Sequence, residues 1–169
     1  MSNKNYNYNR EIKPFRYNQG FNPDKISSIF SSISNMDTQE ISNTSTELQI
    51  PLSVTDDAGN TLIHKILLDG TLQKNELNRL NVIKFLVNNN VNPDSPNREN
   101  VTALHLACSK QYPLIIEYLL ELGVDPNSKD NLGNTPFHYY LNGKLKKYVS
   151  NNIIDLIPEG DMKKLDESK

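Results

Sequence analysis

The sequence predicts an all-α protein built as a short stack of helix–turn–helix units behind a long N-terminal extension. The first observation that predicts this is an internal repeat, because three segments of the 169-residue chain align with one another. In chain order they read DDAGNTLIHKILLDG, NRENVTALHLACSKQ and DNLGNTPFHYYLNGK. The second observation is their spacing, since self-similarity at an interval of about 20 to 50 residues is typical of repeat architectures.

The spacing is read from a Thr-x-x-His core that begins at Thr61, Thr102 and Thr135. The last two threonines are 33 residues apart, whereas the first two are 41 residues apart. The apolar runs that follow, VIKFLV and IIEYLL, are again 33 residues apart. The longer first interval therefore reflects eight extra residues, 71–78, which we expect in the connection between two helices, where an insertion disturbs packing least.

Each unit also carries residues that start and stop short helices. Thr at the N-cap accepts a hydrogen bond from the backbone N–H groups of the first turn, and Pro136 suits the first helical position, which needs no amide donor. Gly70 can end the first helix of a unit, and Asn90 or Gly123 the second, because all three positions favour a left-handed backbone. One helix pair is too small to form a core alone, so the units are expected to stack.

These features resemble the ankyrin repeat, whose consensus core Thr-Pro-Leu-His-x-Ala and 33-residue period the three segments match. The second unit is the most similar, with TALHLAC followed by IIEYLLELGVDPN. The resemblance implies an ankyrin-repeat solenoid over residues 56–159, with repeats at about 56–97, 98–130 and 131–159 and a charged C-terminal tail over 160–169.

The third unit departs from the pattern and resembles a terminal, capping unit. It needs about five extra residues within LNGKLKKYVSNN before Ile153–Ile157 can serve as its second helix. Large side chains also replace the small alanines of the consensus, at Ile66 and Leu67 in the first unit and at Tyr140 and Leu141 in the third. We therefore expect looser helix packing in these two units.

Residues 1–55 form an Asn- and Ser-rich extension that we expect to be largely disordered, because it has too few apolar residues to offset the cost of ordering the chain. One helix is predicted within it, at about 24–34, where Ile26, Ile29, Phe30 and Ile33 share one helical face. This helix either covers an exposed face of the stack or folds onto a partner as a linear motif; the third possibility is that the segment is unstructured.

Composition and motifs argue against catalysis and against bound cofactors or metals. The net charge is −2, and the one cysteine, Cys108, occupies a small position expected to be buried and inert. All three histidines, His64, His105 and His138, stand at the same repeat position, which predicts a structural role. No Gly-rich phosphate loop, HExxH or GxSxG motif is present, so we expect no enzyme.

The resemblance implies a protein partner, held by the hairpin tips and by the exposed face of the first helices. We expect a monomer that binds no membrane and acts in the cytoplasm or nucleus, since the sequence has no signal peptide and no apolar run long enough to span a bilayer. The predicted binding residues are Asp57, Ala58, Asn60, Leu68, Asp69, Arg98, Glu99, Val101, Ser109, Lys110, Asn131, Leu132 and Asn134, together with Asn142 and Gly143.

Two other functions remain open from the sequence. The Asn-, Ile- and Lys-rich composition resembles that of ankyrin proteins from large DNA viruses or amoebae, which suggests an assembly component such as a virion protein. The first 21 residues interleave aromatic and basic side chains in a pattern able to stack on single-stranded bases, which suggests RNA association. The near-neutral charge balance of the whole chain disfavours nucleic acid.

Overall fold

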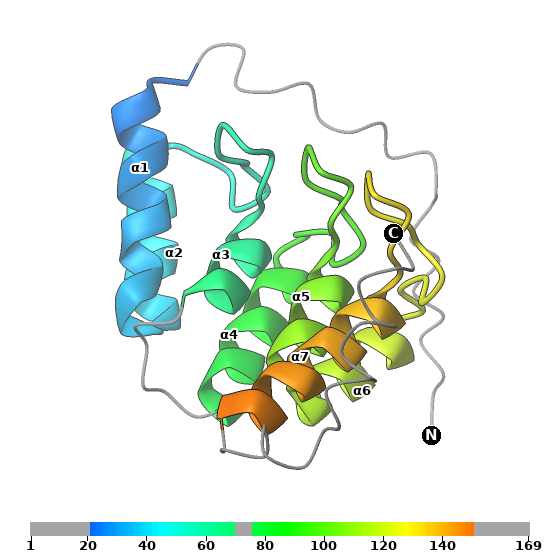
Figure 1. The fold of residues 1–169 in the computed structure, drawn as a ribbon. Helices are drawn as coiled ribbons and strands as arrows, with labels where there is room; N and C mark the ends of the chain where they lie inside the picture. Colours follow the sequence, from blue (N-terminus) through cyan, green and yellow to red (C-terminus); the bar gives the residue numbers. More distant parts are fainter. Residues whose placement is uncertain (1–20, 70–75, 151–169) are drawn as a thin grey trace, which may run out of the picture.

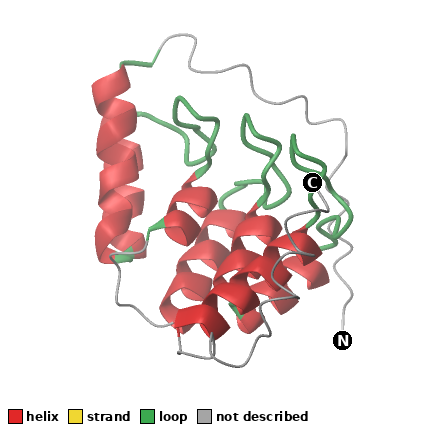
Figure 2. Ribbon diagram, in the orientation of Figure 1, coloured by secondary structure: helices red, strands yellow, loops and turns green. Residues whose placement is uncertain are grey.

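The computed structural model describes residues 21–69 and 76–150, and within these ranges the regular secondary structure is entirely helical (Figure 2). In chain order the helices are α1 (Pro23–Ser32), the 3-10 helix η1 (Ile33–Asn35), α2 (Thr38–Leu48), α3 (Leu62–Leu68), α4 (Glu76–Asn88), α5 (Ala103–Lys110), α6 (Pro113–Glu121) and α7 (Pro136–Ser150). None of these helices combines the length and the apolar run that crossing a lipid bilayer requires.

Helices α3 to α7 form the predicted stack. Helix α5 packs against α3 on one side and α7 on the other, and α4 packs against α6 in a second layer (Figure 1). A hairpin loop precedes each of α3, α5 and α7, and the three loops project side by side from the same edge of the stack (Figure 1). This arrangement confirms the all-α repeat fold expected from the sequence.

The second helices end where the sequence predicts. Asn90 and Gly123, just beyond α4 and α6, have φ of 66° and 80°, which is the left-handed backbone of a helix stop. Gly70, where α3 was predicted to end, lies outside the described residues. So do residues 71–75, which are most of the insertion. Of the eight extra residues, Glu76–Asn78 form the first turn of α4 rather than part of the connection.

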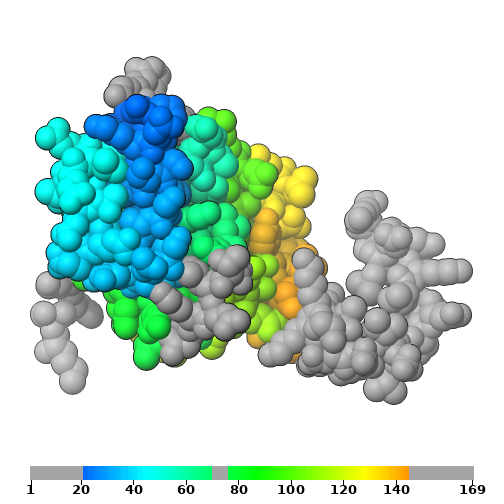
Figure 3. Space-filling view, turned by 90° about the vertical axis from the view of Figure 1, so that its left-hand side faces the viewer, coloured from blue at the N-terminus to red at the C-terminus, as the bar shows by residue number. Residues whose placement is uncertain are grey.

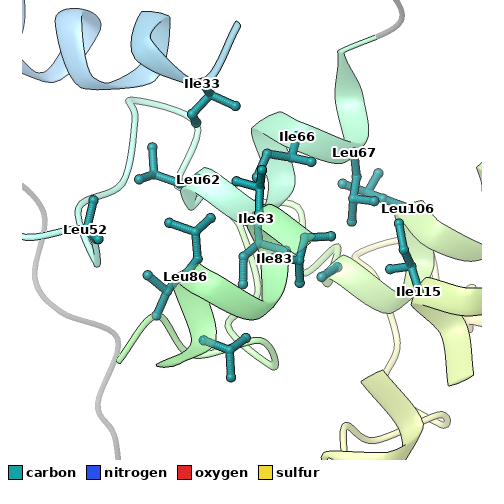
Figure 4. Close-up of a cluster of buried hydrophobic side chains, with 14 of the residues drawn as sticks. Ile33, Leu52, Leu62, Ile63, Ile66, Leu67, Ile83, Leu86, Leu106 and Ile115 are labelled. Carbon is teal, nitrogen blue, oxygen red and sulfur yellow. The ribbon is translucent and has the colours of Figure 1, made fainter. Parts of the chain in front are cut away.

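The hydrophobic core is continuous from α1 to α6. Helix α3 is buried over almost its whole circumference, and it meets α4 on one side and the chain preceding it on another (Figure 4). The labelled core side chains of Figure 4 are Ile33, Leu52, Leu62, Ile63, Ile66, Leu67, Ile83, Leu86, Leu106 and Ile115. The branched Ile66 and Leu67, which replace consensus alanines, are both fully buried.

The described part of the N-terminal extension, residues 21–55, contains α1, η1 and α2, whereas the sequence predicted one helix there. Helix α1 confirms the periodicity: all four side chains of its predicted face are buried, and the Asn22 side chain caps it by accepting from the Asp24 amide at 2.8 Å. Together α1 and α2 lie over the N-terminal end of the stack (Figure 3). Residues 1–20, including the aromatic and basic residues before Phe21, lie outside the described residues.

Helix α2 was not predicted, and its sequence explains why. The helix reads TQEISNTSTEL, in which Ile41 is the one fully buried side chain, so no apolar stripe marks the segment. Its start is encoded locally instead: the Asp37 carboxylate accepts from the Gln39 amide at 2.8 Å. Its order depends on packing beside α1, together with Ile50 from the following loop.

The third unit also differs from its prediction. Helix α7 runs as one helix from Pro136 to Ser150, so the extra residues expected before Ile153 extend the first helix of this unit. The expected second helix, Ile153–Ile157, lies outside the described residues. Gly143 is inside α7 for a steric reason, since a Cβ at this position would overlap the backbone oxygen of Ser109 on α5. The glycine therefore permits close approach of the two helices and does not terminate one of them.

Gly143→Ala is expected to destabilise the stack by about 1 to 2 kcal/mol, even though alanine is the better helix former. The added methyl group meets a backbone oxygen, which cannot move without displacing α5, so the steric cost exceeds the gain in helix propensity. Urea denaturation followed by circular dichroism measures the change. The neighbouring exposed Asn142→Ala is the control and should leave stability equal or slightly higher; an equal gain in both variants would contradict the close contact.

Candidate functional site

The three hairpin tips share one local design. At the first tip the Asp56 carboxylate accepts hydrogen bonds from the backbone amides of Ala58, at 2.9 Å, and Asn60, at 2.8 Å. Asp130 closes the third tip in the same way, accepting from the amides of Leu132 and Asn134 at 2.9 and 2.7 Å. At the second tip the Asn97 side chain takes the place of the aspartate.

Neighbouring tips are also joined to one another. The Arg98 amide donates to the Ala58 carbonyl at 3.0 Å, and the Asn131 amide donates to the Glu99 carbonyl at 2.9 Å. Asparagine side chains add a second set of links: Asn97 to Asn60 at 3.0 Å and Asn100 to Asn131 at 2.7 Å. The tips therefore form one continuous edge, which we call the tip edge (residues 56–60, 97–101 and 130–134).

Two of the three histidines connect a helix start to the next unit. The Thr61 amide donates to Nδ1 of His64 at 3.2 Å, which leaves the proton on Nε2, and Nε2 donates to the Val101 carbonyl at 3.0 Å. His105 repeats this arrangement and donates to the Asn134 carbonyl at 3.1 Å. His138 accepts from the Thr135 amide at 3.1 Å. The structure thus assigns the histidines to the framework of the tips.

Burial favours the neutral form of the His64 and His105 rings. Burial lowers the pKa of both His64 and His105, and their hydrogen bonds to the carbonyls of Val101 and Asn134 oppose this only in part. Protonation would place a hydrogen on Nδ1, where the Thr amide already donates. In the described part of the chain, no group of three His, Cys, Asp or Glu side chains is placed to hold a metal ion. Burial likewise raises the pKa of the Cys108 thiol to about 11, which suits an unreactive position.

Stability is therefore expected to fall on mild acidification. Between its lowered folded pKa and the unfolded value of about 6.5, each buried histidine holds fewer protons in the folded state, so the free energy of unfolding decreases as pH falls. The contribution is complete above about pH 6.5, and the slope below it reaches about 1.4 kcal/mol per pH unit for each histidine. Urea denaturation at several pH values between about 7.5 and about 5 measures this slope. The slope should be smaller in His105→Gln. A free energy of unfolding that does not change with pH in the unaltered chain would contradict the lowered pKa of the buried histidines.

Several predicted binding residues lie exposed on the tip edge. Asp57, Ala58, Arg98, Glu99 and Asn131 are all exposed there, and Leu132 is 87% exposed at the third tip. Asn134 is half-buried, and its amide and carbonyl are both used in the framework.

The remaining predicted residues lie on the first helices beside the tip edge. Leu68 on α3, Lys110 on α5 and Asn142 on α7 are exposed, whereas Ser109 and Gly143 are half-buried where α5 meets α7. Asp69 is half-buried because its carbonyl accepts from the Arg79 guanidinium at 2.9 Å.

Two predicted binding residues are corrected by the structure. Val101 is 5% exposed, because its side chain turns into the core while its carbonyl accepts from His64, so it cannot serve as an apolar anchor. Asn60 is buried as well, since it bonds Asp56 and Asn97. Both positions belong to the part of the turn that faces the neighbouring unit, which their sequence position alone does not reveal.

Arg79 is the structural residue that sequence reasoning missed. It is a fully buried cation on α4 whose guanidinium donates to the backbone carbonyls of Ile66 and Asp69 at the end of α3. The Arg79 guanidinium also lies over the Tyr112 ring, 5.6 Å from the ring centre. The sequence signal for this role was weak: an arginine directly after the eight extra residues 71–78.

Comparison with known proteins agrees with this geometry. The family model described as "Ankyrin repeats (many copies)" matches residues 78–139. RelA-associated inhibitor of Mus musculus is 39% identical over 74 residues, which is 43% of this chain and 8% of that protein. Putative ankyrin repeat protein L271 of Acanthamoeba polyphaga mimivirus is 34% identical over 106 residues, 59% of this chain and 14% of that protein.

A shorter relative is matched over more of its own length. Protein phosphatase 1 regulatory subunit 27 of Homo sapiens is 28% identical over 88 residues, which cover 52% of each chain. The chain thus spans at most about half of the curated relatives described here. The stacked units, the joined tips, the histidine links and the matched family model lead to one conclusion: residues 78–139 of this chain match ankyrin repeats.

Proposed function

We propose that this chain is a non-enzymatic binding module, an adaptor or an inhibitor, which holds a partner protein through the tip edge and the exposed side of the first helices. The observation that carries the proposal is the hydrogen bonding of the tip edge, which joins its backbone within and between tips. A surface ordered in advance loses little conformational entropy on binding, so its exposed side chains can contribute fully to affinity.

The side chains of this surface suit a protein partner of mixed polarity. Leu132 and Leu68 offer exposed apolar contacts, and exposed Arg98, Glu99 and Asp57 add both charge signs. Binding energy in protein interfaces concentrates in a few desolvated residues, and Leu132 is the most exposed of the large apolar side chains at the tips.

The names of the relatives support the same class of function. One is called an inhibitor and another a regulatory subunit, and the family model covers the second unit and the beginning of the third. The proposal includes a monomeric protein acting in the cytoplasm or nucleus, or in the host cytoplasm or virion if the chain is viral. The mimivirus relative is the observation that favours a viral source. The RNA-associated alternative depends on residues before Phe21, outside the described residues.

A variant-dependent crosslinking pull-down from the cell of origin tests the proposal. The test variant combines Arg98→Glu, Lys110→Glu and Leu132→Asp, all on the proposed surface. The matched control combines Glu117→Lys and Glu121→Lys, two exposed positions on α6 in the other layer of the stack. The captured partner should be lost with the test variant and retained with the control, with both variants folded by circular dichroism. Equal capture by the two variants would show that the partner binds elsewhere.

A further inference from the structure

The described structure ends on an apolar surface at the C-terminal side of the stack. Phe137 and Leu141 on α7 are 63% and 42% exposed. The equivalent side chains one unit earlier, Leu104 and Cys108 on α5, are buried beneath the unit that follows them. Tyr140 repeats the contrast, since it is exposed where Ala107 is buried.

The second layer ends in the same way. Leu120 on α6 is 44% exposed, whereas the equivalent Val87 on α4 is 5% exposed beside α6. Ile116 is half-buried where the equivalent Ile83 is fully buried. We call the surface formed by Ile116, Leu120, Phe137, Tyr140 and Leu141 the end face.

In the second unit, α6 packs against both α5 and α4, so a second helix helps to cover these positions there. In α4 the run VIKFL buries Val82, Ile83 and Leu86, and in α6 the run IIEYL buries Ile115 and Leu119. The same order of residue types recurs once more in the chain, as IIDLI at residues 153–157. Asp155 then takes the place of Lys84 and Glu117, which are both exposed. Residues 153–157 therefore match the covering elements at apolar and charged positions alike.

We propose that the C-terminal segment of this chain, residues 151–169, folds back and covers the end face with Ile153, Ile154 and Ile157. The segment follows directly after the last residue of α7, and two asparagines, a residue type that tolerates turn conformations, precede its apolar run. Helix α7 has 15 residues and is about 22 Å long. Five extended residues span about 16 Å, so the segment has ample length to reach Leu141.

The opposite end of the stack argues against a second copy as the occupant. Head-to-tail stacking would require an uncovered first unit, but Ile33 and Leu52 pack over Leu62 there (Figure 4). Helices α1 and α2 lie across this end (Figure 3). With its own C-terminal segment in place, the stack is closed at both ends, and the tip edge is left as the open surface. The inference does not rest on the proposed function, because it concerns a different face.

Paramagnetic relaxation in the full-length chain tests the proposal. In a Cys108→Ala background, Asp155→Cys carries a nitroxide label at a position expected to face solvent, and Ser168→Cys is the control site. The label at residue 155 should cause loss of the methyl signals of Leu120 and Leu141, and the label at residue 168 should affect them less. Replacing Ile153 and Ile157 with lysine, in the labelled chain, should restore the signals, because the covering side chains are removed while the folded stack is untouched.

Three results would overturn the proposal. Unchanged Leu120 and Leu141 signals in the labelled chain would mean that the segment does not dock and that the end face is free for a partner. Signal loss that also occurs between labelled and unlabelled molecules in a mixed sample would assign the end face to a second copy. Signal loss that persists with the two lysines would show that Ile153 and Ile157 do not make the contact. None of these results depends on whether the tip edge binds the partner.

Discussion

Arg79→Ala is expected to destabilise the protein by about 3 kcal/mol, one of the two largest effects of any single substitution we describe. The guanidinium of Arg79 is buried, and it donates to the carbonyls of Ile66 and Asp69 where α3 ends. Backbone carbonyls at a helix C-terminus have no partner within the helix and carry partial negative charge, so a cation there satisfies both needs. Alanine leaves two buried acceptors without this donor and opens a cavity beside Tyr112.

The measurement is the free energy of unfolding from urea denaturation, compared across three variants. Arg79→Lys keeps the charge but not the planar fork that reaches two carbonyls, so we expect it to recover only part of the loss. Lys84→Ala is the matched control, because Lys84 also lies over an aromatic ring, that of Tyr118 at 5.3 Å, but is exposed. It should cost less than about 1 kcal/mol. A cost of Arg79→Ala as small as that of the control would contradict the role assigned to Arg79.

His105→Ala is expected to cost about 3 kcal/mol for a different reason, the loss of a link between two units. The ring is buried, accepts from the Thr102 amide and donates to the Asn134 carbonyl of the third tip. It also packs edge-on against Tyr139, with ring centres 5.0 Å apart. The substitution therefore removes the helix cap, the bond between units and an aromatic contact together.

His138→Ala provides an internal control for this prediction. His138 makes the same local bond to its own threonine amide, but it is exposed, so the substitution removes a cap without uncovering a core. Its expected cost is about 1 kcal/mol. Thermal unfolding of both variants beside the unaltered chain gives the comparison. If the two substitutions lowered stability equally, the local helix cap alone would explain the stability that each histidine contributes. The hydrogen bond between units would then add no measurable stability.

The sequence was most informative where a structural feature is encoded locally. The Thr-x-x-His core predicted where α3, α5 and α7 begin, because an N-cap depends on residues within one turn of one another. The face of α1 was predicted for the same reason, since its four apolar residues follow the helical period. The exposed tip residues Asp57, Arg98 and Leu132 were also placed by their repeat position alone.

The sequence failed where order comes from the neighbours of a segment. Helix α2 has one fully buried apolar side chain, Ile41, so its stability comes from contact with α1 and is invisible to periodicity. Gly143 was predicted only as a binding position on the helices, and the structure shows that it lets α7 approach the backbone of α5 closely. Val101 reads as an exposed tip residue, yet it is buried in the stack.

By itself, then, the sequence determined the repeated helix pairs, their starting points and the common position of the three histidines, because hydrogen bonds within a turn and helical periodicity require only nearby residues. Only the tertiary structure decided that α2 is ordered, that α7 is continuous, that Arg79 completes the end of α3 and that Asn60 and Val101 face inward. The physical reason is that burial belongs to the contact between units, and the residues bonded across that contact are 29 to 37 positions apart in the chain.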